Sequence, residues 1–214
     1  MYRQASKQSS GKNSANSLSE TGYTIDNEFY AETEVKKSRF LAYLTPYDHF
    51  EERLVALQKE FRKANHHVTA FRHLDADDRV VEGCKDDGEP GGTAGRPILK
   101  VLQGRGLINC GVVVVRFFGG TKLGTGGLAR AYADAAIAAI EQASLKAWFL
   151  EMDAKVSLDF ASYDRFQRDA DAAGLHVIQR DYDEAGVTVT LRGAEEDMKP
   201  FLVSYDSVLN RDQR

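Results

Sequence analysis

The chain has 214 residues, of which 43% are hydrophobic and 28% are charged, with a formal net charge of -4 at pH 7. This length fits one large domain or two domains of about 100 residues, and the hydrophobic share argues against a chain that is disordered over most of its length. The two cysteines, Cys84 and Cys110, lack C-x-x-C spacing and are too few for a disulfide framework, so a structural zinc site or redox pair is not expected.

No stretch approaches the ~18 consecutive apolar residues that cross a bilayer, and the N-terminus lacks the apolar block of a secretory signal. We therefore expect a cytoplasmic protein with no membrane partner.

The charges are distributed unevenly along the chain. The first 150 residues hold 20 basic and 18 acidic residues, whereas the remaining residues hold 8 and 14. The segment from Arg96 to Arg130 contains six cations and no acid, and it follows a segment with seven acids between Asp75 and Glu89. These blocks are either ordinary solvated surfaces or parts of a binding face.

Residues 1–22 are rich in Ser, Asn, Gln and Gly, and we expect a disordered tail there. Strands are predicted over 28–35 and 38–44, joined in a hairpin around Lys36 to Ser38. A helix should follow, with Thr45 as its N-cap and Pro46 in its first turn. The apolar residues that recur at helical spacing in it are Phe50, Leu54, Leu57 and Phe61.

The next strands are predicted over 66–74 and 79–84, again as a hairpin. Thr93 should cap a helix that runs from about Ala94 to Leu102. The apolar run 111–118 predicts a buried central strand. After a glycine-rich loop, a helix should run from near Thr125 to about Ala143.

From about Trp148 a smaller and more acidic unit is predicted. Residues 154–160 alternate as a half-buried strand, with Phe160 directed inward, and Ser162 should cap the helix that follows. Strands over 175–180 and 186–192 and a helix from Met198 to Leu209 complete a split β-α-β unit without its closing strand. We therefore expect an N-terminal domain over 23–147 and a C-terminal domain over 148–214.

Two glycine-rich motifs, DDGEPGGTAGRPIL (86–99) and VVVVRFFGGTKLGTGGLARAY (112–132), follow a His66-His67 pair. In this order they resemble the IMPACT family, and the appended small domain resembles its bacterial YigZ-like branch. The resemblance implies an α+β fold with two domains, the first similar to domain 2 of ribosomal protein S5 and the second ferredoxin-like. It also implies a translation-linked or nucleic-acid-binding protein.

The second motif has the composition of an anion site. Its glycines precede a predicted helix, where bare backbone N–H groups and the positive helix end favour an anion. The alternative is that they only permit a tight turn and close helix packing. The candidate anion or nucleic-acid site comprises Arg96, Arg116, Gly119, Gly120, Lys122, Gly124, Thr125, Gly126, Gly127 and Arg130.

No cofactor is expected. The stretch lacks the Walker G-K-[ST] pattern, and its G-x-G-x-x-A, which begins at Gly124, lies six residues beyond the strand end at Phe118.

A secondary candidate site comprises His66, His67, Asp86, Asp87 and Glu89. One of its carboxylates could pair with Arg96 or accept backbone N–H bonds at the helix start, a structural role. Alternatively, the cluster could bind a divalent metal or supply acid and base groups. Strand periodicity places His67 and His73 on one face and His66 on the other. No metal site is predicted.

We therefore expect a cytoplasmic, translation-linked regulatory protein, rather than an enzyme, that binds RNA, the ribosome or a translation-associated protein through a basic, glycine-rich face. Its cations, Arg96, Arg116, Lys122 and Arg130, should converge around the helix start at Thr125. The alternatives are an enzyme that acts on a phosphorylated small molecule and a metal-dependent hydrolase that uses the histidine and aspartate cluster.

Overall fold

A computed structural model describes residues 21–212, so the predicted tail lies outside the described residues except for its last two positions. Those two positions belong to a strand, β1 (Thr21–Thr24), which pairs antiparallel with β7 (Lys146–Phe149). The backbone of Tyr23 also donates to the Gly106 carbonyl and accepts from Ile108, both at 2.9 Å. The ordered fold therefore begins before the predicted boundary at residue 22.

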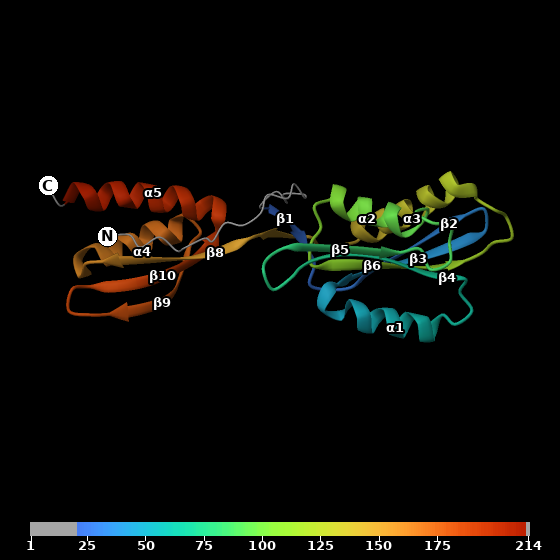
Figure 1. The fold of residues 1–214 in the computed structure, drawn as a ribbon, viewed down its shortest axis with the longest axis horizontal. Helices are drawn as coiled ribbons and strands as arrows, with labels where there is room; N and C mark the ends of the chain where they lie inside the picture. Colours follow the sequence, from blue (N-terminus) through green and yellow to red (C-terminus); the bar gives the residue numbers. More distant parts are fainter. Residues whose placement is uncertain (1–20, 213–214) are drawn as a thin grey trace.

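The chain folds into two α+β units, which Figure 1 shows side by side along the long axis of the molecule. Only Leu150 separates β7 from β8, the first strand of the second unit, so the predicted boundary at 147/148 falls inside β7. The remaining elements are β2 (Phe29–Val35), β3 (Ser38–Pro46), η1 (Tyr47–His49), α1 (Phe50–Glu60), β4 (His66–Leu74), β5 (Val80–Lys85), α2 (Gly95–Gly104), β6 (Cys110–Phe117), α3 (Gly124–Glu141), β8 (Glu151–Leu158), α4 (Phe160–Ala172), β9 (His176–Tyr182), β10 (Val187–Ala194) and α5 (Glu195–Asp212).

The N-terminal unit is a five-stranded antiparallel sheet with the order β2-β3-β6-β4-β5. Helices α2 and α3 cover one face and α1 covers the other (Figure 1). The central strand β6 is buried on both faces, with Val112 and Val114 packed under α2 and α3, and Val113 and Val115 under α1. This explains why its sequence is a continuous apolar run and does not alternate, and it confirms the predicted central strand.

The β2–β3 hairpin is confirmed and closes through two residues. Val35 pairs with Ser38, and Lys36 and Lys37 have φ angles of 48° and 66°. Positive φ at both central residues is the geometry of a type I′ turn, whose twist matches that of the flanking strands.

Several connections meet at one end of this sheet, which we call the loop end: residues 36–37, 61–65, 86–94 and 118–123. The register brings them together, because Arg39 pairs with Phe117, and His66 pairs with Arg116. Strands β5 and β6 both run toward this end, and α2 and α3 both run back from it. The two helices therefore begin at the loop end, on the side of the unit far from the second unit (Figure 1).

Three predicted helix caps are wrong. Thr45 lies in β3 and its hydroxyl donates to Glu28, while α1 begins only at Phe50, after the short helix η1. The Thr93 hydroxyl donates to the Pro90 carbonyl, 2.6 Å away, and so does not cap α2.

At the third position, Asp159 caps α4 by accepting a bond from the Ser162 amide. In each case the predicted residue is of a type that often caps helices, but the backbone conformation does not bring its side-chain oxygen to the first amides of the helix.

The second unit is a three-stranded antiparallel sheet with the order β8-β10-β9, packed against α4 and α5. Its described residues contain no fourth strand, since α5 continues to Asp212. Phe160 is 57% exposed rather than directed inward, because it begins α4 instead of ending β8. The likenesses to ribosomal protein S5 and to ferredoxin-like domains stay predictions.

No helix within residues 21–212 is long and apolar enough to cross a membrane.

The two units have separate hydrophobic cores, and we predict that they unfold separately. Phe166 is fully buried in the second core, with its ring centroid 4.7 Å from that of Tyr205. Phe166→Ala should destabilise this unit by about 3–5 kcal/mol. In hydrogen exchange, amide protection should fall in β8 and β10 but not in β6.

Val203→Ala is the control for that substitution, because Val203 is 73% exposed in the same unit. A parallel loss of protection in β6 would show that the two units unfold as one.

Candidate functional site

A buried carboxylate, Glu89, connects the two glycine-rich motifs. The residue is 8% exposed, and its Oε1 accepts hydrogen bonds from the Tyr132 hydroxyl at 2.7 Å and from the Arg116 guanidinium. The Nε2 atom of His66 lies 3.7 Å from the same oxygen. These groups come from the loop before α2, from α3, from β6 and from β4. Glu89 therefore holds together four segments of the loop end and its surroundings.

The charges in this cluster are balanced internally. Arg116 is 4% exposed, and its guanidinium carbon lies 5.4 Å from the centroid of the Phe40 ring. Burial, followed by the hydrogen bond to Glu89, raises the pKa of Tyr132, so this phenol stays protonated and donates its hydrogen. A buried ion pair of this kind tends to be costly to break from either side.

Asp86 occupies the position of a cap for α2. Its carboxylate accepts bonds from the amides of Gly92 at 2.7 Å, Ala94 at 3.1 Å and Gly95 at 2.8 Å. Burial alone would raise the pKa of Asp86, but these donors, with the charge of Arg96, lower it below its usual value. The ionised carboxylate thus neutralises the positive end of α2. This is the structural role that the sequence left open for the acidic cluster.

Asp87 and the two histidines also bond within the protein. The Asp87 carboxylate accepts from the His67 amide at 2.6 Å, and the Asp87 carbonyl lies 2.7 Å from Nδ1 of His66. A carbonyl can only accept, so this bond assigns the hydrogen to Nδ1 and leaves Nε2 facing Glu89.

His67 and His73 belong to the other face of β4, and both are partly buried. His73 stacks on Tyr47 with ring centroids 3.7 Å apart, and burial lowers the pKa of His67 despite the nearby charge of Asp87. Within the described part of the chain, no three His, Cys, Asp or Glu side chains are grouped so that they could hold a metal ion.

The glycine loop is held by a close backbone contact. A Cβ atom on Gly119 would lie 2.0 Å from the carbonyl carbon of Lys37, so only glycine fits against the β2–β3 turn. Gly120 and Gly124 have φ angles of 86° and 74°, which favour glycine, whereas Gly126 lies in α3 without a positive φ. Glycine is therefore needed at 119 for the close approach of two backbone segments, and it is favoured at 120 and 124 by the positive φ angles.

The start of α3 differs from the start of α2. It has no side-chain cap and no acid in its first turn, and Gly124, Thr125 and Gly126 are exposed. The first amides of a helix have no partner within the helix. At α3 they face solvent beside Lys122 and remain available to an anion.

Three of the four predicted cations are exposed in the structure, and the fourth is buried. Arg96 lies in the first turn of α2, Lys122 in the glycine loop and Arg130 on α3. All three are exposed and have no ion-pair partner among the described residues. Arg116 is instead buried against Glu89, because its side chain points to the face covered by α3. Arg116 was predicted to bind a phosphate, but in the structure its guanidinium pairs with the buried carboxylate of Glu89.

Two features of this end were missed from the sequence. Tyr132 was not among the predicted site residues, although a buried phenol needs a hydrogen-bond partner and thereby signals a polar group nearby. The Lys36–Lys37 turn was not assigned to the site, because its neighbour Ser38 is 81 positions from Gly119, whose amide donates to the Ser38 hydroxyl at 3.1 Å.

The chain was compared with known proteins. Residues 36–140 match the family model of the Impact N-terminal domain. An IMPACT family member of Haemophilus influenzae is 45% identical over 104 residues, which cover 47% of this chain and 50% of that protein. The IMPACT family member YigZ of Escherichia coli is 42% identical over 112 residues, covering 51% of this chain and 55% of that protein.

The chain thus spans about half the length of these curated relatives, and both glycine-rich motifs lie within the matched family range. A solved structure described as the crystal structure of an hypothetical protein has a TM-score of 0.57 at 27% identity, covering 89% of this chain and 94% of that chain.

Glu89→Ala should strongly destabilise the N-terminal unit, because it leaves the Arg116 charge buried without its carboxylate. We expect a loss of about 3–5 kcal/mol in urea unfolding. The double variant Glu89→Met with Arg116→Met should lose much less than the sum of the single variants. Additive losses would show that the two groups do not stabilise each other. Glu32→Ala, which breaks an exposed ion pair, is the control and should have a small effect.

Two glycines of the second motif, Gly119 in the loop and Gly126 in α3, should respond in opposite directions to alanine. Gly119→Ala should destabilise by about 1–3 kcal/mol, since the new methyl group overlaps the backbone of Lys37. Gly126→Ala should stabilise by about 0.5–1 kcal/mol, because this helical position is open and alanine has the better helix propensity. The check is the urea midpoint of each variant, and equal effects would rule out the contact at Gly119 as the cause.

Proposed function

Because this chain belongs to the IMPACT family, with bacterial YigZ-like relatives, we propose that it is a cytoplasmic, translation-linked regulatory protein that binds RNA through the loop end of its N-terminal unit. The observation that carries the RNA contact is the uncapped start of α3, beside exposed cations that have no ion-pair partner among the described residues.

Both components of this site favour a phosphate. The exposed amides at Gly124 to Gly126 supply hydrogen-bond donors, and the end of the helix dipole adds partial positive charge. Lys122 and Arg130 add full charges that no carboxylate among the described residues neutralises. An RNA backbone presents a series of such anions, so neighbouring cations can act on successive phosphates.

The polar groups near the site support binding over catalysis. Asp86 is committed to the start of α2, and Glu89 is committed to Arg116 and Tyr132. General acid–base catalysis requires a group that is free to exchange a proton with a substrate. An enzyme that holds a phosphorylated small molecule at the same loop is the competing interpretation, and it predicts binding to a small phosphate ester instead of RNA.

Lys122→Ala with Arg130→Ala should weaken binding of a labelled single-stranded RNA and flatten its salt dependence. The slope of log affinity against log salt should fall by about one for each phosphate that the variant no longer binds. The measurement is fluorescence anisotropy between low and physiological salt.

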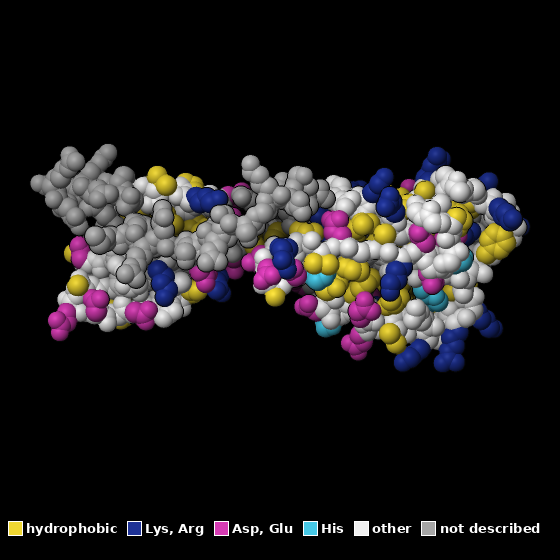
Figure 2. Space-filling model, in the orientation of Figure 1, with side chains coloured by type: hydrophobic (Ala, Val, Ile, Leu, Met, Phe, Trp, Pro, Cys, Tyr) yellow, Lys and Arg dark blue, Asp and Glu magenta, His cyan; other side chains and the backbone are white. Residues whose placement is uncertain are grey.

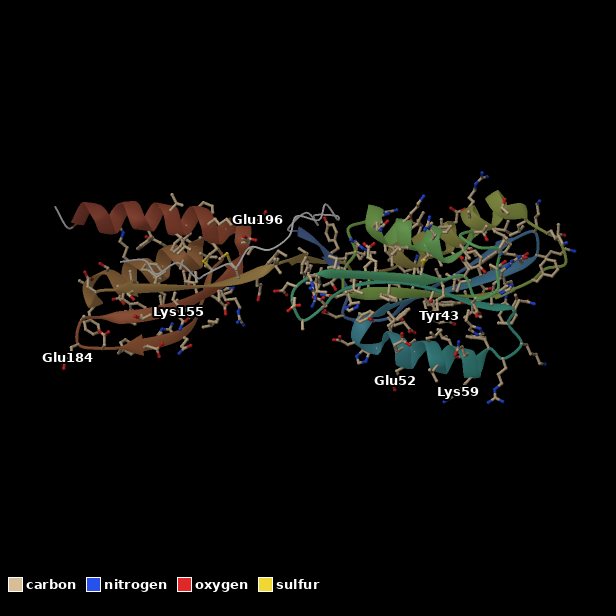
Figure 3. The ribbon with its side chains drawn as sticks, in the orientation of Figure 1. Tyr43, Glu52, Lys59, Lys155, Glu184 and Glu196 are labelled. Atoms are coloured by element: carbon tan, nitrogen blue, oxygen red, sulfur yellow. The ribbon has the colours of Figure 1, made fainter. Side chains whose placement is uncertain are left out.

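Lys155→Ala with Arg168→Ala is the matched control, because both cations are exposed in the second unit. Figure 3 labels Lys155 there, on β8. RNA binding by the Lys122 and Arg130 variant that equals the parent would contradict the proposed site. Retention of a protein or whole ribosomes, with no affinity for free RNA, would replace RNA with that partner.

A further inference from the structure

An exposed aromatic ring stands at the loop end. Phe118 is 46% exposed, although it directly follows the buried central strand. Its amide donates to the Asn65 side chain at 2.8 Å, and the next amide, of Gly119, donates to the Ser38 hydroxyl at 3.1 Å. The guanidinium of Arg116 lies over the ring, 5.7 Å from its centroid. The backbone on both sides of the ring is thus anchored to neighbouring segments.

Cations from three separate segments lie at the same end of the sheet as this ring. Lys36 and Lys37 form the β2–β3 turn, which packs directly on Gly119, and Lys122 lies in the same loop as Phe118. Arg62 and Lys63 are exposed between α1 and β4, next to the Asn65 that holds the Phe118 backbone. Figure 2 shows Lys and Arg side chains gathered around this end of the N-terminal unit. Such a grouping depends on the fold, since the three segments are distant in the sequence.

Few free carboxylates oppose these cations. Asp86 and Glu89 are engaged in the bonds described above, and the Asp87 carboxylate accepts from the His67 amide. Glu34 is exposed in β2 and lies opposite Arg39 in the strand register, but Arg39 is paired with Glu32, so Glu34 is the carboxylate that stays next to the turn cations. The loop end therefore presents an aromatic ring within a positively charged surface.

We propose that the loop end binds single-stranded RNA, with one base stacked on Phe118 and the flanking phosphates bound by the Lys36–Lys37 turn and by Lys122. This inference rests on the proposed function and specifies its substrate. Only an unpaired base can leave its own stack and lie on a protein ring. An aromatic ring in a basic groove is the usual arrangement for single strands, and it tolerates any sequence because every base has a flat face.

The test compares three variants on two probes: a labelled oligouridine and an RNA duplex of equal length. Phe118→Ala should weaken oligouridine binding at least about fivefold, the lower end of measured base stacking. The salt slope should stay unchanged, because no charge is removed, and duplex binding should not change. Phe118→Trp should retain oligouridine binding, which separates the loss of stacking from a loss of folding.

The third variant, Lys36→Asn with Lys37→Gly, removes both turn cations while supplying the residues that a type I′ turn prefers. It should reduce both the affinity and the salt slope. Phe160→Ala is the matched control, since Phe160 is a 57% exposed phenylalanine in the second unit.

The outcomes separate the two proposals. Unchanged oligouridine binding by Phe118→Ala, together with weaker binding on changing Lys122 and Arg130, would overturn base stacking and leave the proposed function standing. An equal loss of affinity for the duplex would overturn single-strand specificity. Binding to anionic lipid vesicles or to an acidic peptide, with no affinity for either RNA, would overturn both proposals.

Discussion

A carboxylate removed from water is stable only beside a positive partner and hydrogen-bond donors, and the arrangement of the loop end depends on how Glu89 meets this constraint. Its oxygen accepts bonds from Arg116 at the end of β6 and from Tyr132 on α3. Glu89 lies in the loop before α2, so these bonds join that loop to the central strand and to α3. The glycine loop runs between two of these partners, from Arg116 on β6 to the helix that carries Tyr132.

The two helices that begin at the loop end differ in whether a side chain binds their first backbone amides. Asp86 satisfies the first amides of α2 and places a negative charge at its positive end. No side chain caps α3, and its first turn carries no acid. The same acidic segment therefore stabilises one helix start internally and leaves the other exposed to solvent, beside Lys122. Of the two helix starts at the loop end, that of α3 is therefore the one whose backbone amides remain available to an anion.

The negative charge of the C-terminal unit need not repel an anion that binds at the loop end. Residues 151–214 carry 8 basic and 14 acidic residues, but the second unit, as described over residues 151–212, lies beyond the end of the N-terminal sheet that is opposite the loop end (Figure 1). Charges in solvent are screened beyond about 8 Å at physiological ionic strength. The separation of the units along the long axis thus allows a basic surface and an acidic unit to coexist in one chain of net charge -4.

Most strands and helices could be predicted from the sequence, because apolar periodicity and turn residues are local: the strand 66–74 was predicted with the bounds of β4, and the run 111–118 as the central strand. The short strands β1 and β7 were not predicted, because they are defined by pairing with each other across 122 residues or more of chain. It also identified both glycine motifs and the family. Which polar groups meet, by contrast, became visible only in the folded chain. Arg116 was assigned to an anion but pairs with Glu89, and Thr93 was assigned as a cap but Asp86 takes that place. Partners such as these are chosen by distance in space, which residue spacing does not encode once strands from distant parts of the chain pair side by side.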